Sequence, residues 1–196
     1  KTIDKSRVRS AIEDAQSLAQ ELGLGLGLDF VFPSIESVDT ILPFISEYDL
    51  PLLLDSGEEE VRIRAYAMAK ELGIESKVVA NGIYINSSDR ELSSIKDSKI
   101  KAAILLAFDP SNPRSSIKPS SRIELIKNVL LPKAEKAGIE KPIIDAVVLD
   151  PASIALSATT IALIKNELGY PAGCAPANAL GNISTKNLSV EEVISI

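Results

Sequence analysis

The 196-residue sequence contains no histidine and a single cysteine, Cys174. Without histidine, these residues cannot form a Ser-His-Asp or Cys-His nucleophile, a histidine general base or the usual zinc ligand sets, and we expect no metal site. One cysteine excludes an internal disulfide and is consistent with a reducing cytoplasm. We interpret it as a small buried side chain rather than a nucleophile. Any chemistry must therefore rest on carboxylates, amides, backbone groups or a bound cofactor.

Basic charge and long apolar segments are also scarce. The formal net charge is −6, so the chain lacks the basic surface that binds nucleic acid, and we expect no nucleic-acid partner. The uncharged run 151–164 contains Ser and Thr and is shorter than the ~18 apolar residues of a membrane span, so it predicts a buried helix. No signal peptide is recognisable. We expect a cytoplasmic protein that does not span a membrane, or one peripheral to a membrane complex. Because the chain begins at Lys1 rather than Met, we also expect a piece of a longer protein.

What the sequence does contain is a recurring unit, in which a helix closes on glycine and an apolar strand follows after a short gap. The closing glycines are Gly23, Gly73, Gly138 and Gly169, and each is predicted to adopt the left-handed conformation that ends a helix. The strands are continuous apolar runs, which are typical of parallel sheets covered by crossover helices. They are predicted at 28–32, 52–54, 78–80, 102–108, 143–149 and 170–174.

Six such units fit two α/β architectures, an open doubly wound sheet and a (β/α)₈ barrel. The composition, 45% hydrophobic and 24% charged, is that of one globular domain and does not choose between them. A full barrel has eight strands and typically ~250 residues. This chain starts in a helix and ends soon after a strand, as a barrel without its first and last strands would. In both architectures the functional face lies at the carboxyl ends of the strands.

Polar residues close several of the predicted strands. Asp55 is the best candidate for function, because Ser56 and Glu59 fit a Ser-x-x-Glu capping box and leave Asp55 free. Asn81, which precedes Gly82, fits a ligand-binding role and a left-handed turn equally well.

Two other acidic residues are better explained by local structure. Asp109, before Pro110, is typical of a turn initiator. Asp150, before Pro151, is typical of a helix N-cap with proline at the first helical position.

Asp145 is the most informative residue, because it sits inside an apolar strand. An unpaired carboxylate there would cost several kcal/mol, so it must meet a partner. Few basic residues are near it in sequence, and we therefore favour a ligand as that partner. Asn178 follows the last predicted strand and fits either a helix cap or a site residue.

At these positions the chain resembles the pterin-binding methyltransferase family. The similar stretches occur in family order and cover nearly the whole sequence: PLLLDS (51–56), VANGI (79–83), AILLAFDP (103–110), AEKAG (134–138), PIID (142–145) and LGYPAG (168–173) followed by Asn178. Within the family, the resemblance is greatest to a subunit that acts on tetrahydromethanopterin. It implies a TIM (β/α)₈ barrel, here incomplete, with strands two to seven present and 1–196 as a single partial pterin-binding domain.

The resemblance also implies a site and a reaction. Asp55, Asn81 and Asp145 would bind the pyrimidine edge of a methyl-tetrahydropterin. Asn178 would lie near N5, which carries the methyl group, and would act as the catalytic amide as well as in binding. The methyl group would pass to Co(I) of a corrinoid held by a partner protein. Other subunits of a methyltransferase complex are expected partners too, and a homodimer is compatible.

The chain departs from the family pattern at two strand ends. The family motif Asn-Ser-Ile-Asn reads Asn81-Gly-Ile-Tyr84 here, and Gly-Ile-His reads Ala175-Pro-Ala. Two alternative functions remain. A dihydropteroate synthase would need a basic residue near the end of strand seven, whereas 170–180 has none. A non-catalytic subunit would bind a pterin or dock a corrinoid protein without turnover.

Overall fold

Six parallel strands form one sheet, in the order in which they occur along the chain, in the computed structural model, which describes residues 4–180. The strands are β1 (Leu28–Val31), β2 (Leu52–Asp55), β3 (Val78–Ile83), β4 (Ala102–Leu106), β5 (Lys141–Asp145) and β6 (Ala172–Gly173). Each begins within two residues of its predicted position. The alternation of strands and helices and the α/β class are thereby confirmed.

Helices occupy the segments between the strands. They are α1 (Lys5–Leu22), α2 (Ile35–Ile45), α3 (Glu59–Glu71), α4 (Asp89–Asp97), α5 (Pro119–Leu125), α6 (Leu131–Lys136) and α7 (Ile154–Leu163). Shorter helical turns are η1 (Glu75–Lys77), η2 (Pro113–Ser116), η3 (Ile126–Leu130), η4 (Pro151–Ser153), η5 (Ile164–Leu168) and η6 (Pro176–Leu180). The predicted glycine caps are confirmed, because Gly23, Gly73, Gly138 and Gly169 all have φ between 64° and 73°.

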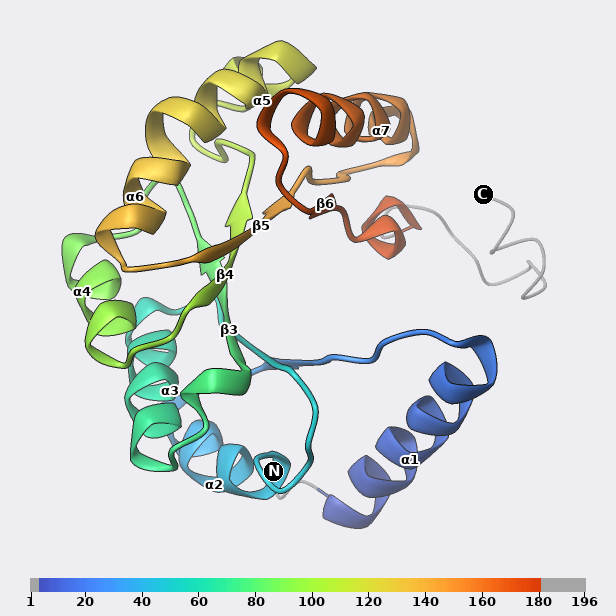
Figure 1. The fold of residues 1–196 in the computed structure, drawn as a ribbon, viewed down its shortest axis with the longest axis vertical. Coiled ribbons are helices and arrows are strands. Elements are labelled where there is room, and N and C mark those ends of the chain that lie inside the picture. Colours follow the sequence, from blue (N-terminus) through green and yellow to red (C-terminus); the bar gives the residue numbers. More distant parts are fainter. Residues whose placement is uncertain (1–3, 181–196) are drawn as a thin grey trace.

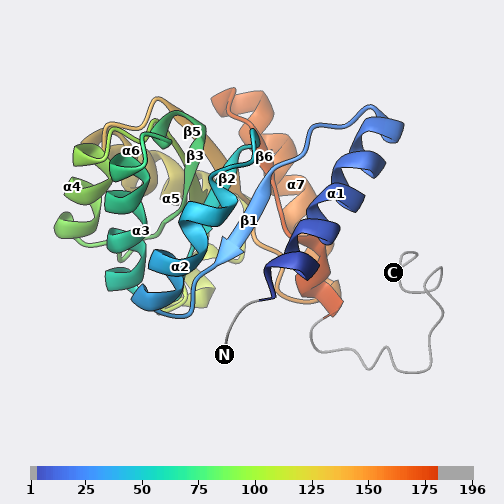
Figure 2. The same cartoon turned by 90° about the horizontal axis from the view of Figure 1, so that it is seen from below.

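The helices and strands together form an arc. Figure 1 shows α2, α3, α4 and α6 along the outer side of the curved sheet, with α1 at one end of the arc and α7 at the other. Figure 2, turned by 90°, again shows α1 and α7 on the side opposite α3 and α4. The sheet thus has a helix-covered face and a face that opens between α1 and α7.

Burial follows these two faces, because successive side chains of a strand point to opposite sides. On the helix-covered face the side chains are completely buried; they are Leu52, Leu54, Ala80, Ala103, Leu105 and Ile144. On the other face, Leu53, Ile104, Leu106 and Ile143 are only partly buried. The apolar runs led us to expect covered faces, and the part of the chain that the structure describes covers one of them.

The run 151–164 forms a helix, as predicted, but most of it is not buried. Ser157 and Thr160 are buried in α7, whereas Ile154 is 36% exposed. The prediction of a buried helix was therefore wrong, because this helix lies at the end of the arc and only one of its sides packs against the rest (Figure 1). Among residues 4–180, no helix is both long and apolar enough to cross a membrane.

Candidate functional site

Asp55, Asn81 and Asp145 share the open face of the sheet, towards its carboxyl edge. Asp55 pairs with Asn81 in register, and Asn81 pairs with Ile104. Two residues further along β4, Leu106 pairs with Asp145. Residues in register, and residues two apart on a strand, point to the same side. The three predicted site residues therefore face the same open side, and each is partly buried.

Asn81 is a strand residue and not the turn residue that the sequence also allowed. It lies inside β3, and among the described non-glycine residues only Lys99 and Val147 have positive φ. The following residue, Gly82, passes so close to β4 that an added Cβ atom would lie 2.8 Å from the Ile104 carbonyl oxygen. Glycine at this position lets the two strands approach each other directly beside the Asn81 side chain.

A fourth polar residue on the open face, Asp29, was not recognised in the sequence. It lies in β1, two residues before Val31, which pairs with Asp55. The Asn81 side chain reaches across β2 and places its Nδ2 atom 3.5 Å from Asp29 Oδ1, at the upper limit for a hydrogen bond. The signal that could have found Asp29 is the one used for Asp145, an acidic residue inside an apolar strand.

Asp29 and Asp55 form an acidic pair next to Asn81. Burial raises the pKa of Asp55, and the charge of Asp29 raises it further, against opposing effects of the Ser56 backbone and of Arg62. Partial shielding from water also raises the pKa of Asp29, while the Asn81 amide lowers it. A carboxylate whose proton affinity is raised by a neighbouring carboxylate favours a ligand that offers N–H donors or positive charge.

Asp145 has a different environment, because the protein supplies partners for it. Its Oδ1 accepts a hydrogen bond of 2.8 Å from the Val147 amide. Burial raises the pKa of Asp145, while that amide and the charge of Arg122 lower it. Arg122 is a protein partner that the sequence neighbours of Asp145 do not indicate, because it comes from a distant part of the sequence, on α5. That a ligand also binds this carboxylate stays a prediction.

Arg122 is almost completely buried behind Asp145. Its Nε donates to the Ser116 carbonyl at 2.7 Å, and its Nη1 donates to the carbonyls of Ala146 and, at 3.2 Å, Val147. Val147 has a φ of 50°, which is rare for a β-branched residue. Its carbonyl also accepts a hydrogen bond of 2.6 Å from Ser157 Oγ. The turn after β5 is thus held by Asp145, Arg122 and Ser157 together.

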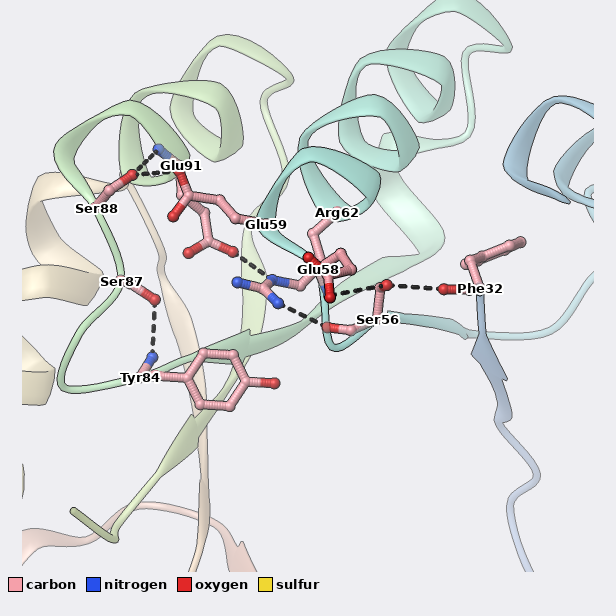
Figure 3. A network of polar contacts seen from close by, with 9 residues as sticks. All are labelled: Phe32, Ser56, Glu58, Glu59, Arg62, Tyr84, Ser87, Ser88 and Glu91. Carbon is pink, nitrogen blue, oxygen red and sulfur yellow. Dashed lines mark hydrogen bonds and ion pairs between the residues drawn. The ribbon is translucent and has the colours of Figure 1, made fainter. Parts of the chain in front are cut away.

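The end of β2 is held by a second buried network, drawn in Figure 3. Ser56 Oγ donates to the Phe32 carbonyl at 2.7 Å and accepts from the Glu58 amide at 3.2 Å. The predicted capping box is wrong, because Glu58 is the N-cap of α3 and makes no side-chain cap bond. Glu59 instead accepts a hydrogen bond of 2.7 Å from Ser88 Oγ. A long-range bond to the neighbouring strand end has replaced the local one.

Arg62 completes this network. Its Nε lies 2.5 Å from Glu91 Oε1 in a buried ion pair, and its Nη1 donates to the Ser56 carbonyl at 2.6 Å (Figure 3). The backbone that follows Asp55 is therefore fixed by α3 and α4 together. A rigid supporting layer is what keeps a binding side chain in one position.

The other two acidic candidates, Asp109 and Asp150, have structural roles. Asp109 is a structural turn residue, as predicted, and accepts hydrogen bonds from the Ser111 and Asn112 amides at 2.9 and 3.1 Å. Asp150 caps η4 through the Ser153 amide at 2.8 Å, which confirms the N-cap interpretation.

Residues that follow β6 lie at the other end of the open face. Asn178 lies within η6 and is exposed, so it does not cap that turn. The backbone amide of Asn178 donates to the Ala175 carbonyl at 3.1 Å. Cys174 is half-buried, and burial together with the charge of Asp145 raises the pKa of its thiol, which opposes a nucleophilic role.

Comparison with known proteins identifies the family. The profile of the family described as "Tetrahydromethanopterin S-methyltransferase MtrH subunit" matches residues 2–187. Among relatives named as the H subunit of tetrahydromethanopterin S-methyltransferase, the protein of Methanopyrus kandleri is 31% identical over 181 residues, which are 89% of this chain and 56% of the relative. The protein of Methanococcus maripaludis is 34% identical over 143 residues, 70% of this chain and 45% of the relative. The chain thus spans about half the length of the curated relatives that it matches, and the resemblance noted in the sequence is confirmed.

Proposed function

The chain belongs to the family of tetrahydromethanopterin S-methyltransferase MtrH subunits, and from that membership we propose that it forms the pterin-binding region of a methyltransferase. The methyl group would leave N5 of a methyl-tetrahydropterin, of the tetrahydromethanopterin or tetrahydrofolate type. Its acceptor would be Co(I) of a corrinoid carried by a partner protein. The observation that carries this proposal is the placement of Asp55, Asn81 and Asp145 on one open face at the carboxyl edge of the sheet.

The acid and amide groups suit the pyrimidine edge of a pterin. That edge presents N–H donors at N3 and at the 2-amino group, and ionised carboxylates are pure acceptors. Asp55 and Asp145 are the proposed binding carboxylates, and Asp29 adds a third acceptor beside Asn81. Because Asp55 and Asp145 are partly buried, hydrogen bonds to them exchange less with water than hydrogen bonds at a fully exposed site.

Methyl transfer from N5 is a displacement with a poor leaving group. The pair of electrons of the breaking C–N bond stays on N5, so a donor or a proton at N5 lowers the barrier. We assign this role to the side-chain amide of Asn178, which needs no histidine. The corrinoid supplies the Co(I) nucleophile, and this chain contributes by holding the pterin in line for the attack.

We also propose that the six strands are strands two to seven of a (β/α)₈ barrel and that 1–196 is a single partial barrel domain. Parallel strands in sequence order, helices on one face and the curvature in Figure 1 support this architecture. The open face would then be the barrel interior, with the pterin at its carboxyl-end mouth. Expected partners are a corrinoid protein, other subunits of a methyltransferase complex and, for a homodimer, a second copy of the chain.

One experiment tests the function. The full-length protein is titrated with methyl-tetrahydromethanopterin and with methyl-tetrahydrofolate, and methyl transfer to its Co(I) corrinoid partner is followed in single turnovers. Binding followed by transfer supports the enzyme. Binding without transfer would favour a non-catalytic pterin-binding subunit, an alternative that the exposed position of Asn178 keeps open. A dihydropteroate synthase is disfavoured, because 170–180 contains no Lys or Arg. Absence of pterin binding would overturn the proposal.

A further inference from the structure

Tyr84 stands directly after β3, where the family motif has Asn and where no other role is assigned to it. Its backbone is fixed on both sides. The Tyr84 amide donates to Ser87 Oγ at 3.0 Å, and the Ser87 amide donates to the Tyr84 carbonyl at 3.1 Å. Lys133, on α6, donates to the Ser87 carbonyl at 2.6 Å and ties the whole turn to the helical layer. These bonds fix the backbone position from which the Tyr84 side chain extends.

The aromatic ring of Tyr84 is held by Arg62. The guanidinium carbon lies 5.1 Å from the ring centroid, within the range of a cation–π contact, and Arg62 is itself fixed by Glu91. Figure 3 shows the ring extending beneath Arg62 from the turn, with the hydroxyl at its far end and on the side of the β2 terminus. The position of the hydroxyl is therefore set by the same network that fixes the backbone after Asp55.

The hydroxyl of Tyr84 has a hydrogen to donate. Burial raises its pKa, and the negative charge of Asp55 raises it further, so the hydroxyl is protonated at neutral pH. The Gly82 backbone acts in the opposite direction, which is the effect of an amide that faces the phenol oxygen. Among the hydrogen bonds of residues 4–180, Tyr84 donates through its backbone amide and not through its hydroxyl. The hydroxyl hydrogen is therefore available to a ligand or to water.

We propose that Tyr84 contacts the ligand and that its hydroxyl donates a hydrogen bond to the 4-oxo oxygen of the pterin ring. This inference rests on the proposed function. The pyrimidine edge carries donors at N3 and the 2-amino group but an acceptor at the 4-oxo position. Ionised Asp29 and Asp55 can only accept, and the Asn81 amide is already directed at Asp29. Asn81 directs one of its two N–H groups at Asp29, so the Tyr84 hydroxyl is a second donor for this cluster and favours 4-oxo over 4-amino ring systems.

The test uses Tyr84→Phe in the full-length protein. The substitution keeps the ring on Arg62 and removes only the hydroxyl, so the fold is preserved. Affinity is measured by titration for methyl-tetrahydromethanopterin and for a 2,4-diaminopteridine, in which a donor replaces the 4-oxo acceptor. We expect about three- to tenfold weaker binding of the first ligand and no loss for the second, the scale of one neutral hydrogen bond. Tyr170→Phe, at the opposite end of the sheet before β6, is the matched control and leaves both affinities unchanged.

Three other results would overturn either the Tyr84 contact or the proposed function. Unchanged affinity of Tyr84→Phe for the 4-oxo ligand overturns the contact while leaving the proposed function intact. Equal weakening for both ligands also overturns it, because the hydroxyl would then act through Asp55 and not on the 4-oxo oxygen. Failure of the unsubstituted protein to bind the 4-oxo pterin overturns the proposed function, and the inference with it.

Discussion

The two carboxylate clusters on the open face are built in opposite ways. At the β1–β3 end, Asp55 faces a second carboxylate, Asp29, which raises its pKa beyond the effect of burial. At the β5 end, burial also raises the pKa of Asp145, but the Val147 amide and the buried cation Arg122 oppose that rise. The β1–β3 cluster is unfavourable until a donor ligand or a proton arrives. The β5 cluster is largely satisfied by the protein. Residues of the same type at equivalent strand ends can thus differ in how much of their interaction energy is available for a ligand.

The largest expected effect lies in the scaffold of the β5 cluster. Arg122→Met leaves the carbonyls of Ser116 and Ala146 without this donor, the Val147 carbonyl with Ser157 Oγ alone, and Asp145 without its cation. We expect a loss of about 3 kcal/mol or more in the free energy of unfolding. Arg64→Met is the control, since Arg64 forms only partly exposed ion pairs and should cost less than about 1 kcal/mol. Urea titration of both variants measures the difference, and similar losses would contradict the contrast.

The next effect concerns two amides, one in the β1–β3 cluster and one beyond β6. Asn178 is proposed to bond N5 mainly as the methyl group leaves, so Asn178→Ala should slow transfer by roughly 10²-fold while pterin affinity stays within a few fold. Asn81→Ala should mainly weaken binding. Pterin titration combined with single-turnover transfer separates the two quantities. Equal affinity losses with an unchanged transfer rate would reduce Asn178 to a binding residue.

The third prediction compares Asp55 with Asp145 in pterin affinity and in melting temperature. Asp55→Ala and Asp145→Ala should each weaken pterin binding by about 1.5–3 kcal/mol, the scale of a charge-assisted hydrogen bond. Their stabilities should differ. Asp145→Ala leaves the Val147 amide without its acceptor and should lower the melting temperature, whereas Asp55→Ala relieves repulsion and should not.

Asp145→Asn is the control for this pair, because it keeps an oxygen that can accept from Val147 and should melt close to the unsubstituted protein. Thermal melts, measured alongside the pterin titrations, show whether Asp145 contributes to stability and Asp55 does not. An Asp55→Ala variant that melts as early as Asp145→Ala would show that both clusters are equally structural.

The smallest effect is the pH dependence of the acidic pair. A carboxyl group with a raised pKa in the folded state binds protons more tightly there than in the unfolded chain. Its stability contribution therefore falls as pH rises from its ordinary pKa through the raised one. Asp29→Asn removes one charge and the repulsion on Asp55. We expect a gain below about 1 kcal/mol at neutral pH, because water screens partly exposed charges, and no gain in acid. Melting temperatures across this range measure it, and a gain that persists at low pH would point to another cause.

Local signals in the sequence predicted much of this fold. Apolar runs located all six strands, and the glycines located helix ends, because both depend on residues next to each other in the chain. The Asp109 turn and the Asp150 cap were correct for the same reason. Asp29 carried a local signal too, an acidic residue within an apolar strand, and was overlooked.

Other errors arose where distant residues meet. The Ser56 hydroxyl donates to the Phe32 carbonyl at the end of β1, a long-range contact that no local motif indicates. Arg122 approaches Asp145 from α5, so the apparent lack of a basic partner was a statement about sequence neighbours only. The exposure of α7 depends on which elements surround it, and composition does not reveal that.

The sequential strand order has a consequence for how the chain reaches this structure. Within residues 4–180, strands pair only with their neighbours in sequence, so strand pairing closes loops of modest length. Even the Lys133 to Ser87 contact across the helical layer joins residues only 46 positions apart. Because the entropy of loop closure is small for such loops, each unit can add to its predecessor as it leaves the ribosome. The fold can therefore form by adding units in chain order from its amino-terminal end.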